Sequence, residues 1–202
     1  MDKYLYYVDD KPYLNITNKC SNHCDFCIRN DRKTMDGQNL WLKNQTPTAE
    51  EIIEQVKTEK NLSQEFVFCG FGEPTENLSA LLSVARFIKA NGGTIRLNTN
   101  GQSDLINRRS TAKEISEVCD VISISLNDCT PADYQKLCHC EFGEDAFPAL
   151  LRFAKECDEN GAKVILSVVD VIGEEKVEKC REICNRLGLT LRVRTYIPVT
   201  QH

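Results

Sequence analysis

The chain has 202 residues, of which 41% are hydrophobic and 27% charged, with a formal net charge of −5. These values predict one globular domain, 1–202, and argue against a broad nucleic-acid-binding face. No apolar run approaches the ~20 residues needed to cross a bilayer, and the N-terminus lacks the apolar core of a signal peptide. Eleven cysteines, an odd number without the spacing of a disulfide framework, favour a reducing cytoplasm.

Short β-branched runs alternate with amphipathic helical stretches along the chain. Six strands are predicted, at 12–17, 65–69, 94–98, 121–126, 163–169 and 191–197. The helices between them have recognisable ends: a Thr48–Glu51 capping box, a stop at Asn91, a short helix at 113–118, and stops at Asn160 and Gly188. This βαβ alternation is typical of a parallel sheet, and right-handed crossovers in sequence order place all helices on one side.

Six βα units fall short of the eight that close a standard (β/α)8 barrel. The predicted fold is therefore α/β, a partial (β/α)6 TIM-like barrel that is open on one side. A flat doubly wound sheet is the structural alternative. The barrel is favoured because polar or glycine-rich motifs follow the first four strands in turn, and the carboxyl ends of parallel strands meet at one rim.

Three closely spaced cysteines follow the first predicted strand. Cys20, Cys24 and Cys27 have the spacing C-x3-C-x2-C, with the aromatic Phe26 before the last cysteine. Three thiolates could hold three irons of a cubane iron–sulfur cluster and leave the fourth iron open to another ligand. A structural zinc loop is the alternative. Zinc would need a fourth ligand, however, and no second C-x2-C pair follows, while His23 could serve only by distorting the loop.

The second predicted strand is followed by a turn that reads Gly70, Phe71, Gly72, Glu73 and Pro74. Glycine permits backbone conformations that are closed to other residues, and it lets a ligand approach the main chain. Exposed carbonyls with a glutamate nearby suit an ammonium group, which needs several acceptors. An ordinary turn is the alternative for this segment taken alone.

Polar side chains at the ends of the remaining strands complete the set of candidate binding residues. Amides after the third strand could donate to and accept from ribose hydroxyls, with an Asn-Gly turn as the alternative. Strand parity places further side chains of the last two strands at the same mouth, although a buried serine or valine is more often packing. The candidates are Asn98, Asn100, Ser125, Asn127, Ser167, Val169, Arg194 and Tyr196.

Taken together, these loops resemble the motifs of the radical S-adenosylmethionine (radical SAM) superfamily over nearly the whole chain. The resemblance implies that the three loop cysteines bind a [4Fe-4S] cluster and that the Gly70–Pro74 turn holds the amino group of SAM. It also implies that residues 98–101 lie beside the nucleoside and that Ser125 donates to the SAM carboxylate. The cysteine loop and Gly-Phe-Gly-Glu-Pro-Thr are most similar to short radical SAM proteins associated with TatD-type metal-dependent hydrolases.

The resemblance further implies reductive cleavage of SAM and abstraction of a hydrogen atom from an unidentified substrate that could be a macromolecule. An electron donor such as flavodoxin or ferredoxin would be a partner, and a TatD-type hydrolase a functional link. An apolar, water-poor barrel interior is expected to protect the radical. Two alternatives remain: an activating enzyme that places a radical on a partner protein, and a non-catalytic Fe–S or zinc module. A mere electron carrier would not need the glycine and Ser-Leu loops.

The other cysteines and the local basic groups are expected to be structural. Cys157, Cys180 and Cys184 fall on apolar helix faces and are expected to be core thiols. Cys69 could lie near the radical, but a buried strand end is the simpler interpretation. Cys138-His139-Cys140 departs from the family pattern and is expected to be a surface loop, with a second metal site as the alternative. Basic residues such as Arg29, Arg32 and Lys33 are expected to be solvated.

Overall fold

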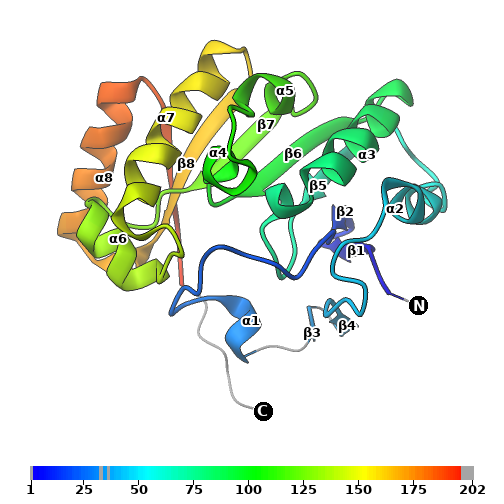
Figure 1. The fold of residues 1–202 in the computed structure, drawn as a ribbon, viewed down its shortest axis with the longest axis horizontal. Coiled ribbons are helices and arrows are strands. Elements are labelled where there is room, and N and C mark those ends of the chain that lie inside the picture. The colour runs from blue at the N-terminus through cyan, green and yellow to red at the C-terminus, as the bar shows by residue number, and fades with distance from the viewer. Residues whose placement is uncertain (1, 32–33, 36, 197–202) are drawn as a thin grey trace.

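The structure, a computed structural model, describes residues 2–31, 34–35 and 37–196 of the chain. Its main sheet consists of β1 (Leu5–Val8), β2 (Lys11–Leu14), β5 (Glu65–Phe68), β6 (Thr94–Thr99), β7 (Val121–Ser125), β8 (Lys163–Val169) and β9 (Thr190–Arg194). These strands lie in the order β1-β2-β5-β6-β7-β8-β9, and all neighbours from β2 onward are parallel. Six parallel strands in sequence order confirm the partial (β/α)6 barrel (Figure 1).

The longer helices follow the predicted pattern closely. They are α2 (Ala49–Val56), α3 (Leu78–Ala90), α7 (Ala146–Glu159) and α8 (Glu174–Leu187). The capping box of α2 is present, with the Thr48 hydroxyl accepting from the Glu51 N–H and the Glu51 carboxylate accepting from the Thr48 N–H. Shorter helices are α1 (Ile28–Asp31), α4 (Ser103–Asn107), α5 (Ala112–Ser116) and α6 (Pro131–Cys138). No helix in the described ranges is both long and apolar enough to span a membrane.

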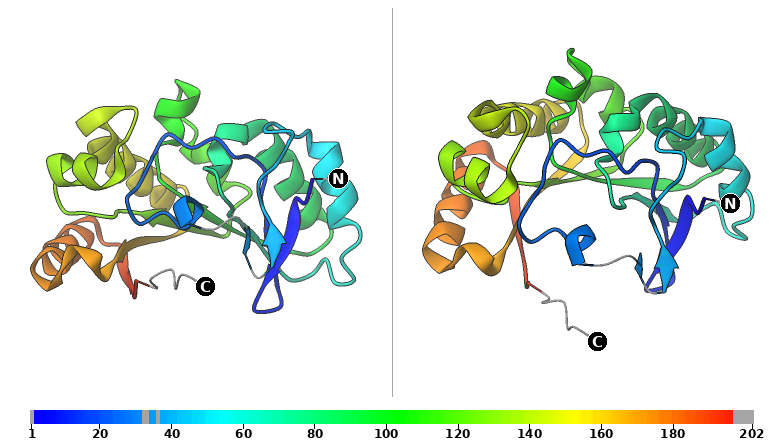
Figure 2. Two further views of the ribbon diagram at one scale, coloured as in Figure 1. Left: turned by 90° about the horizontal axis from the view of Figure 1, so that it is seen from below. Right: turned by 60° about the horizontal axis from the view of Figure 1, so that its bottom comes forward.

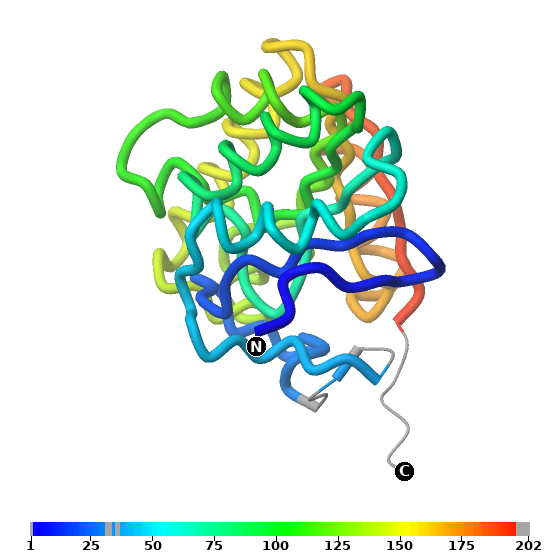
Figure 3. The backbone as a smooth tube through the Cα atoms, turned by 90° about the vertical axis from the view of Figure 1, so that its right-hand side faces the viewer, coloured from blue at the N-terminus to red at the C-terminus, as the bar shows by residue number. Residues whose placement is uncertain are grey.

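Two hairpins were not predicted. β1 pairs antiparallel with β2 and extends the sheet at its N-terminal edge (Figure 3). Both residues of its turn, Asp9 and Asp10, have positive φ angles of 49° and 60°, as a type I′ hairpin requires. Asp-Asp is a weaker signal for this turn than Asn-Gly. A second, two-stranded sheet joins β3 (Thr34–Met35) to β4 (Gln38–Asn39). The last predicted strand ends earlier than expected, and its residue 197 lies outside the described ranges.

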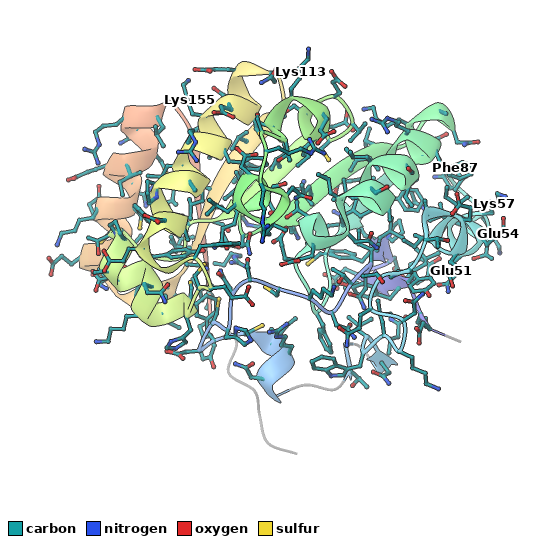
Figure 4. All side chains as sticks on the ribbon, viewed as in Figure 1. Glu51, Glu54, Lys57, Phe87, Lys113 and Lys155 are labelled. Atoms are coloured by element: carbon teal, nitrogen blue, oxygen red, sulfur yellow. The ribbon has the colours of Figure 1, made fainter. Side chains whose placement is uncertain are left out.

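The two faces of the main sheet differ in chemistry. Helices α3, α4, α5 and α7 cover one face (Figure 2), and the strand residues beneath them are fully buried and apolar. These residues are Phe66, Phe68, Ile95, Leu97, Ile122, Ile124, Leu166 and Val168. Charged side chains such as Lys113 of α5 and Lys155 of α7 point outward from the helices (Figure 4). This helix-covered face is the hydrophobic core.

The opposite, inner face of the partial barrel carries many polar side chains. Because side chains alternate along a strand, the residues between the buried ones point inward. Apolar side chains such as Val67 and Ile165 are mixed with polar ones in these rows. The inward polar residues are Glu65, Arg96, Asn98, Ser123, Ser125, Ser167, Arg192 and Arg194. The prediction of an apolar barrel interior is therefore wrong. The β-branched runs suggested an apolar interior, but most of their large apolar side chains face the helices.

Candidate functional site

The cysteine loop runs from β2 along the carboxyl ends of the strands toward α6 and then turns back into α1 (Figure 1). Its backbone is fixed by the segment that follows α6. The N–H groups of His23 and Asp25 donate to the carbonyls of Cys138 and Leu137 at 2.8 and 3.1 Å. In return, the N–H of Glu141 donates to the Ser21 carbonyl at 2.9 Å. The loop is thus held by three backbone hydrogen bonds to a segment more than 100 residues later in the chain.

A buried network of side-chain hydrogen bonds lies beneath the same loop. The Ser21 hydroxyl donates to Gln102 Oε1 at 2.7 Å, and Gln102 Nε2 donates to Asn22 Oδ1 at 3.0 Å and to the Tyr134 hydroxyl at 2.7 Å. Asn100 Nδ2 donates to Ser21 Oγ at 2.9 Å, while Asn100 Oδ1 accepts from the Gln102 N–H. Both amide atoms of Asn100, a predicted ribose contact, are therefore engaged by the protein. Such a satisfied network fixes one loop conformation.

The three loop cysteines are half-buried and fit a cluster better than a single zinc ion. Sulfurs bound tetrahedrally at ~2.3 Å from one zinc would lie ~3.8 Å apart. Within the described part of the chain, only Asp128, Cys129 and Asp133 form a set of three metal-ligating side chains whose ligand atoms all lie within 4.8 Å of one another. The loop sulfurs are spread more widely, as the ligands of a multi-iron cluster are. The two carboxylates of the acidic set already share one cation, because Lys176 Nζ lies 2.9 Å from Asp128 and 3.1 Å from Asp133.

Arg29 joins the cysteine loop to the glycine turn. Its guanidinium donates to the carbonyls of Asn18 at 3.2 Å, Phe71 at 3.1 Å and Asn22 at 3.4 Å. Burial raises the pKa of the Cys20 thiol to about 12, and the Arg29 cation acts in the opposite direction. The expectation of a solvated Arg29 is wrong, because three carbonyls from two loops converge on it. Arg32 and Lys33 lie outside the described residues.

Cys138 and Cys140 are buried, so the predicted surface loop is wrong for both. Cys138 ends α6, where its 3.6-residue period turns both Tyr134 and Cys138 inward. The Cys138 thiol is hydrogen-bonded to the Cys24 thiol, a contact that raises the pKa of Cys24 more than burial does. The Cys140 thiol donates to Gln102 Oε1 at 3.2 Å. Only His139 is exposed, and it lies 2.7 Å from Asp25.

The glycine turn after β5 packs directly on the cysteine loop. Neither Gly70 nor Gly72 has a positive φ, so the prediction that these glycines serve an unusual backbone conformation is wrong. Space is the actual constraint. A Cβ at Gly72 would lie less than 3.0 Å from the carbonyl oxygens of Thr17 and Lys19, and one at Gly70 would overlap the Asn15 side chain. Glycine here permits close approach of two chain segments.

Glu73 is buried, and both oxygens of its carboxylate accept hydrogen bonds. Oε1 accepts from the Thr75 N–H at 3.1 Å, the Thr75 hydroxyl at 2.8 Å and the Thr99 hydroxyl at 2.7 Å. Oε2 accepts from the Asn100 N–H at 2.7 Å. Burial raises the pKa of this carboxyl group, and these hydrogen bonds oppose the shift. Together with the bond from the Glu73 N–H to the Lys19 carbonyl, they join the turn to β6 and to the cysteine loop.

The register brings several predicted residues onto one inner face. Ser125 pairs with Ser167, which pairs with Arg192, and Val169 pairs with Arg194. Asn98, which pairs with Ser123 on the same face, is half-buried and hydrogen-bonded to Cys69. The predicted set thus meets at the carboxyl ends of β6 to β9.

Three other predicted residues lie elsewhere. Phe71 packs with Tyr6 and Leu40 in a small cluster, and Trp41 contacts its ring edge-on at 5.3 Å. Phe26 is half-buried within the cysteine loop. Tyr196 follows β9 and is 39% exposed, and its N–H donates to Asp170. These positions do not place the three side chains together at the inner face.

Asn127 carries a buried side-chain oxygen to which no described group donates a hydrogen bond. It follows β7 with a φ of 61° and is only 3% exposed. Its Nδ2 donates to the Cys138 sulfur at 3.2 Å, whereas its Oδ1 has no partner among the described residues. A buried acceptor without a donor is costly, so a ligand donor here would be stabilising. A polar cavity of about 340 Å³ also opens beside Cys20, Arg29 and Glu76, within the size range of ligand pockets.

The fold and the site together define an α/β partial-barrel protein with a loop of three half-buried cysteines at the carboxyl ends of its strands. The family model of the radical SAM superfamily matches residues 14–187. The chain therefore belongs to the radical SAM superfamily and is an enzyme of that superfamily. Membership implies a [4Fe-4S] cluster and SAM as cofactors, and the three cysteines and the unpaired Asn127 oxygen fit such ligands. Comparison with curated proteins finds no significant match.

Several solved structures share this fold. Streptococcus suis SuiB bound to S-adenosylmethionine aligns with a TM-score of 0.68 and 20% identity, over 93% of this chain and 40% of that one. A radical SAM methyltransferase from Sphaerobacter thermophilus aligns at 0.64 and 18%, over 95% and 57%. The protein anSMEcpe with bound AdoMet aligns at 0.65 and 17%, over 92% and 50%. The chain thus spans between about two fifths and three fifths of the length of these structures.

Replacing Gly72 with alanine is expected to destabilise the fold by about 1–3 kcal/mol, because the added methyl group would overlap two backbone carbonyls that cannot rotate away. Denaturant unfolding of the cluster-free protein would measure the loss. Gly70→Ala is a companion variant with a similar expected loss, because its methyl group would overlap the buried, hydrogen-bonded Asn15 side chain. Equal stability of Gly72→Ala and wild-type protein would contradict the close packing of turn and loop.

Proposed function

We propose that the protein cleaves SAM reductively and that the resulting 5′-deoxyadenosyl radical abstracts a hydrogen atom from a macromolecular or peptide-like substrate. The observation that carries this proposal is the arrangement of three half-buried cysteines on a loop bonded to the Gly70–Pro74 turn. When bound, the cluster supplies the electron that breaks the sulfonium bond of SAM. The protein supplies the position of each group.

Different residues would position the cluster and the parts of SAM. Cys20, Cys24 and Cys27 would hold the cluster. The carbonyls of the Gly70–Gly72 turn would accept from the SAM ammonium, with Glu73 fixing the turn to β6. The unpaired Asn127 oxygen would accept from a hydroxyl or amino group of the nucleoside, and Ser125 would donate to the SAM carboxylate.

Anaerobic reconstitution with iron, sulfide, SAM and a reductant tests the proposal. The expected products are methionine and 5′-deoxyadenosine, and isotope tracing from candidate substrates into 5′-deoxyadenosine would identify the hydrogen donor. Cluster-loaded protein that fails to cleave SAM would favour a non-catalytic Fe–S module. A radical found on an added protein would favour an activating enzyme.

The finer assignment rests on sequence similarity. The Cys-Ser-Asn-His-Cys-Asp-Phe-Cys loop and Gly-Phe-Gly-Glu-Pro-Thr support placement among the TatD-associated radical SAM proteins, and hence a functional link to a TatD-type hydrolase. A flavodoxin or ferredoxin is the electron donor that we propose, in a reducing cytoplasm. Copurification with a TatD-type hydrolase would test the link.

SAM cleavage without substrate is expected to be slow and uncoupled, because β9 is an edge strand among the described residues and its own residues are mostly exposed. Binding of the macromolecular substrate should cover this edge and accelerate formation of 5′-deoxyadenosine. The control is protein in which all three loop cysteines are replaced, which should show no cleavage. A site sealed by the chain itself would contradict this idea. Residues 197–199, part of the predicted opening, lie outside the described ranges.

A further inference from the structure

Two arginines of β9 share the inner face of the partial barrel. Arg192 pairs with Ser167 and Arg194 with Val169 across the β8–β9 ladder. The intervening Val193 lies on the outer face, where it lines a cavity with residues of α8 such as Val177 and Arg181. Because side chains alternate along a strand, both arginines must point inward, about 6.7 Å apart along the strand.

Arg192 and Arg194 differ from Arg96, the other inward arginine, because Arg96 has a carboxylate as its ion-pair partner. Arg96 forms an ion pair with Glu65 on the neighbouring strand at 3.1 Å. Among the residues that the structure describes, no carboxylate pairs with Arg192 or Arg194. Like charges two residues apart on one face of a strand repel each other, and water screens these two in part because both residues are exposed. Two adjacent uncompensated guanidinium groups are therefore favourable only if an anion or water offsets them.

Arg194 also reaches toward the centre of the site. Burial raises the pKa of the Cys69 thiol, and Arg194 is close enough to oppose that shift, as is a hydrogen bond from Asn98. Cys69 follows β5, and three strands, β6, β7 and β8, separate β5 from β9 in the sheet. Arg194 therefore lies within electrostatic range of Cys69, which adjoins the glycine turn where SAM is proposed to bind.

We infer that Arg192 and Arg194 form a subsite for an oxyanion of the substrate, a carboxylate or phosphate group, on the inner face of the partial barrel. The planar guanidinium binds such groups through two parallel N–H···O bonds, so two adjacent arginines can grip one anion from both sides. Ser167, between the proposed SAM site and Arg192, offers a neutral neighbour rather than a competing acid. This inference rests on the proposed function, because it names the chemistry of the substrate that the same site would bind.

Chemical modification of arginine tests the subsite. Reconstituted protein would be treated with phenylglyoxal, which attacks accessible guanidinium groups, and each arginine would be followed by mass spectrometry of its peptide. The modification rate would be measured in protein without additions and in protein with SAM, inorganic phosphate, acetate, or SAM plus either anion. Chloride would keep the ionic strength constant in all samples. Arg181 and Arg186 of α8, both exposed and away from the inner face, are the internal controls.

Phosphate or acetate is expected to slow modification of Arg192 and Arg194 roughly tenfold at ten times its Kd, with or without SAM, and to spare the two control arginines. Protection by phosphate but not acetate would indicate a phosphate-bearing substrate, protection by acetate but not phosphate a carboxylate, and equal protection a subsite that accepts either oxyanion. Arg192→Gln should weaken protection of Arg194, whereas Arg181→Gln should leave it unchanged.

Three results would overturn the subsite. Protection by SAM alone, with no further effect of either anion, would make both arginines part of the cofactor site. If neither anion protects Arg192 and Arg194, their role would be to prevent the edge strand β9 from pairing with a strand of another molecule. Equal slowing of all four arginines would show general ion screening. Iron content and SAM cleavage, measured on the same samples, separate this failure from failure of the proposed function, since anion protection needs neither.

Discussion

Replacing Cys20, Cys24 and Cys27 together with alanine is expected to abolish the iron–sulfur absorption of anaerobically purified protein, from about four irons per chain to none. The reason is that these thiols are the soft ligands of the loop, and their spread exceeds that of ligands to a single zinc ion. Iron and acid-labile sulfide analysis would measure the loss.

Other cysteines provide matched controls. Cys157, Cys180 and Cys184 are buried on helix faces, so their replacement with alanine should keep the iron and lower only stability. Cys138→Ala is the sharper control, because its thiol touches that of Cys24 without belonging to the loop. Iron retained in the triple loop variant, or lost in Cys138→Ala, would show that the ligand assignment is wrong.

Glu73→Gln is expected to weaken SAM binding by roughly tenfold or more while sparing iron content. The substitution replaces one acceptor oxygen with an NH2 group that faces N–H and O–H donors, and it removes charge-assisted bonds worth ~1.5–3 kcal/mol. At about 1.4 kcal/mol per decade, even the lower value accounts for a tenfold loss. Because the carboxylate holds the turn in place, the effect would reach SAM through the turn carbonyls.

Anaerobic calorimetry of SAM binding, with iron analysis of the same protein, would measure this effect. Glu59→Gln is a suitable control, since Glu59 is also a hydrogen-bonded carboxylate but lies at the far edge of the sheet, where it accepts from the Tyr7 hydroxyl. Thermal unfolding of both variants would show whether weaker SAM binding reflects a displaced turn in a folded protein or a general loss of stability. Unchanged SAM affinity in Glu73→Gln would remove the turn from the binding site.

The sequence by itself determined the succession of strands and helices and the position of the cysteine loop. These features depend on neighbouring residues: hydrophobic periodicity within a strand or helix, the capping box at Thr48, and the left-handed glycine that ends α8. Six βα units then leave few topologies, because crossovers are right-handed and sequential strands lie side by side. The partial barrel and the loops at its rim could be predicted for that reason.

Only the tertiary structure decided how those loops contact one another. Arg29 donates hydrogen bonds to carbonyls of two loops, and Glu73 accepts hydrogen bonds from donors of β6. Cys138 contacts the thiol of Cys24. None of these contacts leaves a periodic signal, because each joins segments that are distant in sequence. The inner face, too, is polar because the sheet turns its large apolar side chains toward the helices, where burial removes most apolar surface from water.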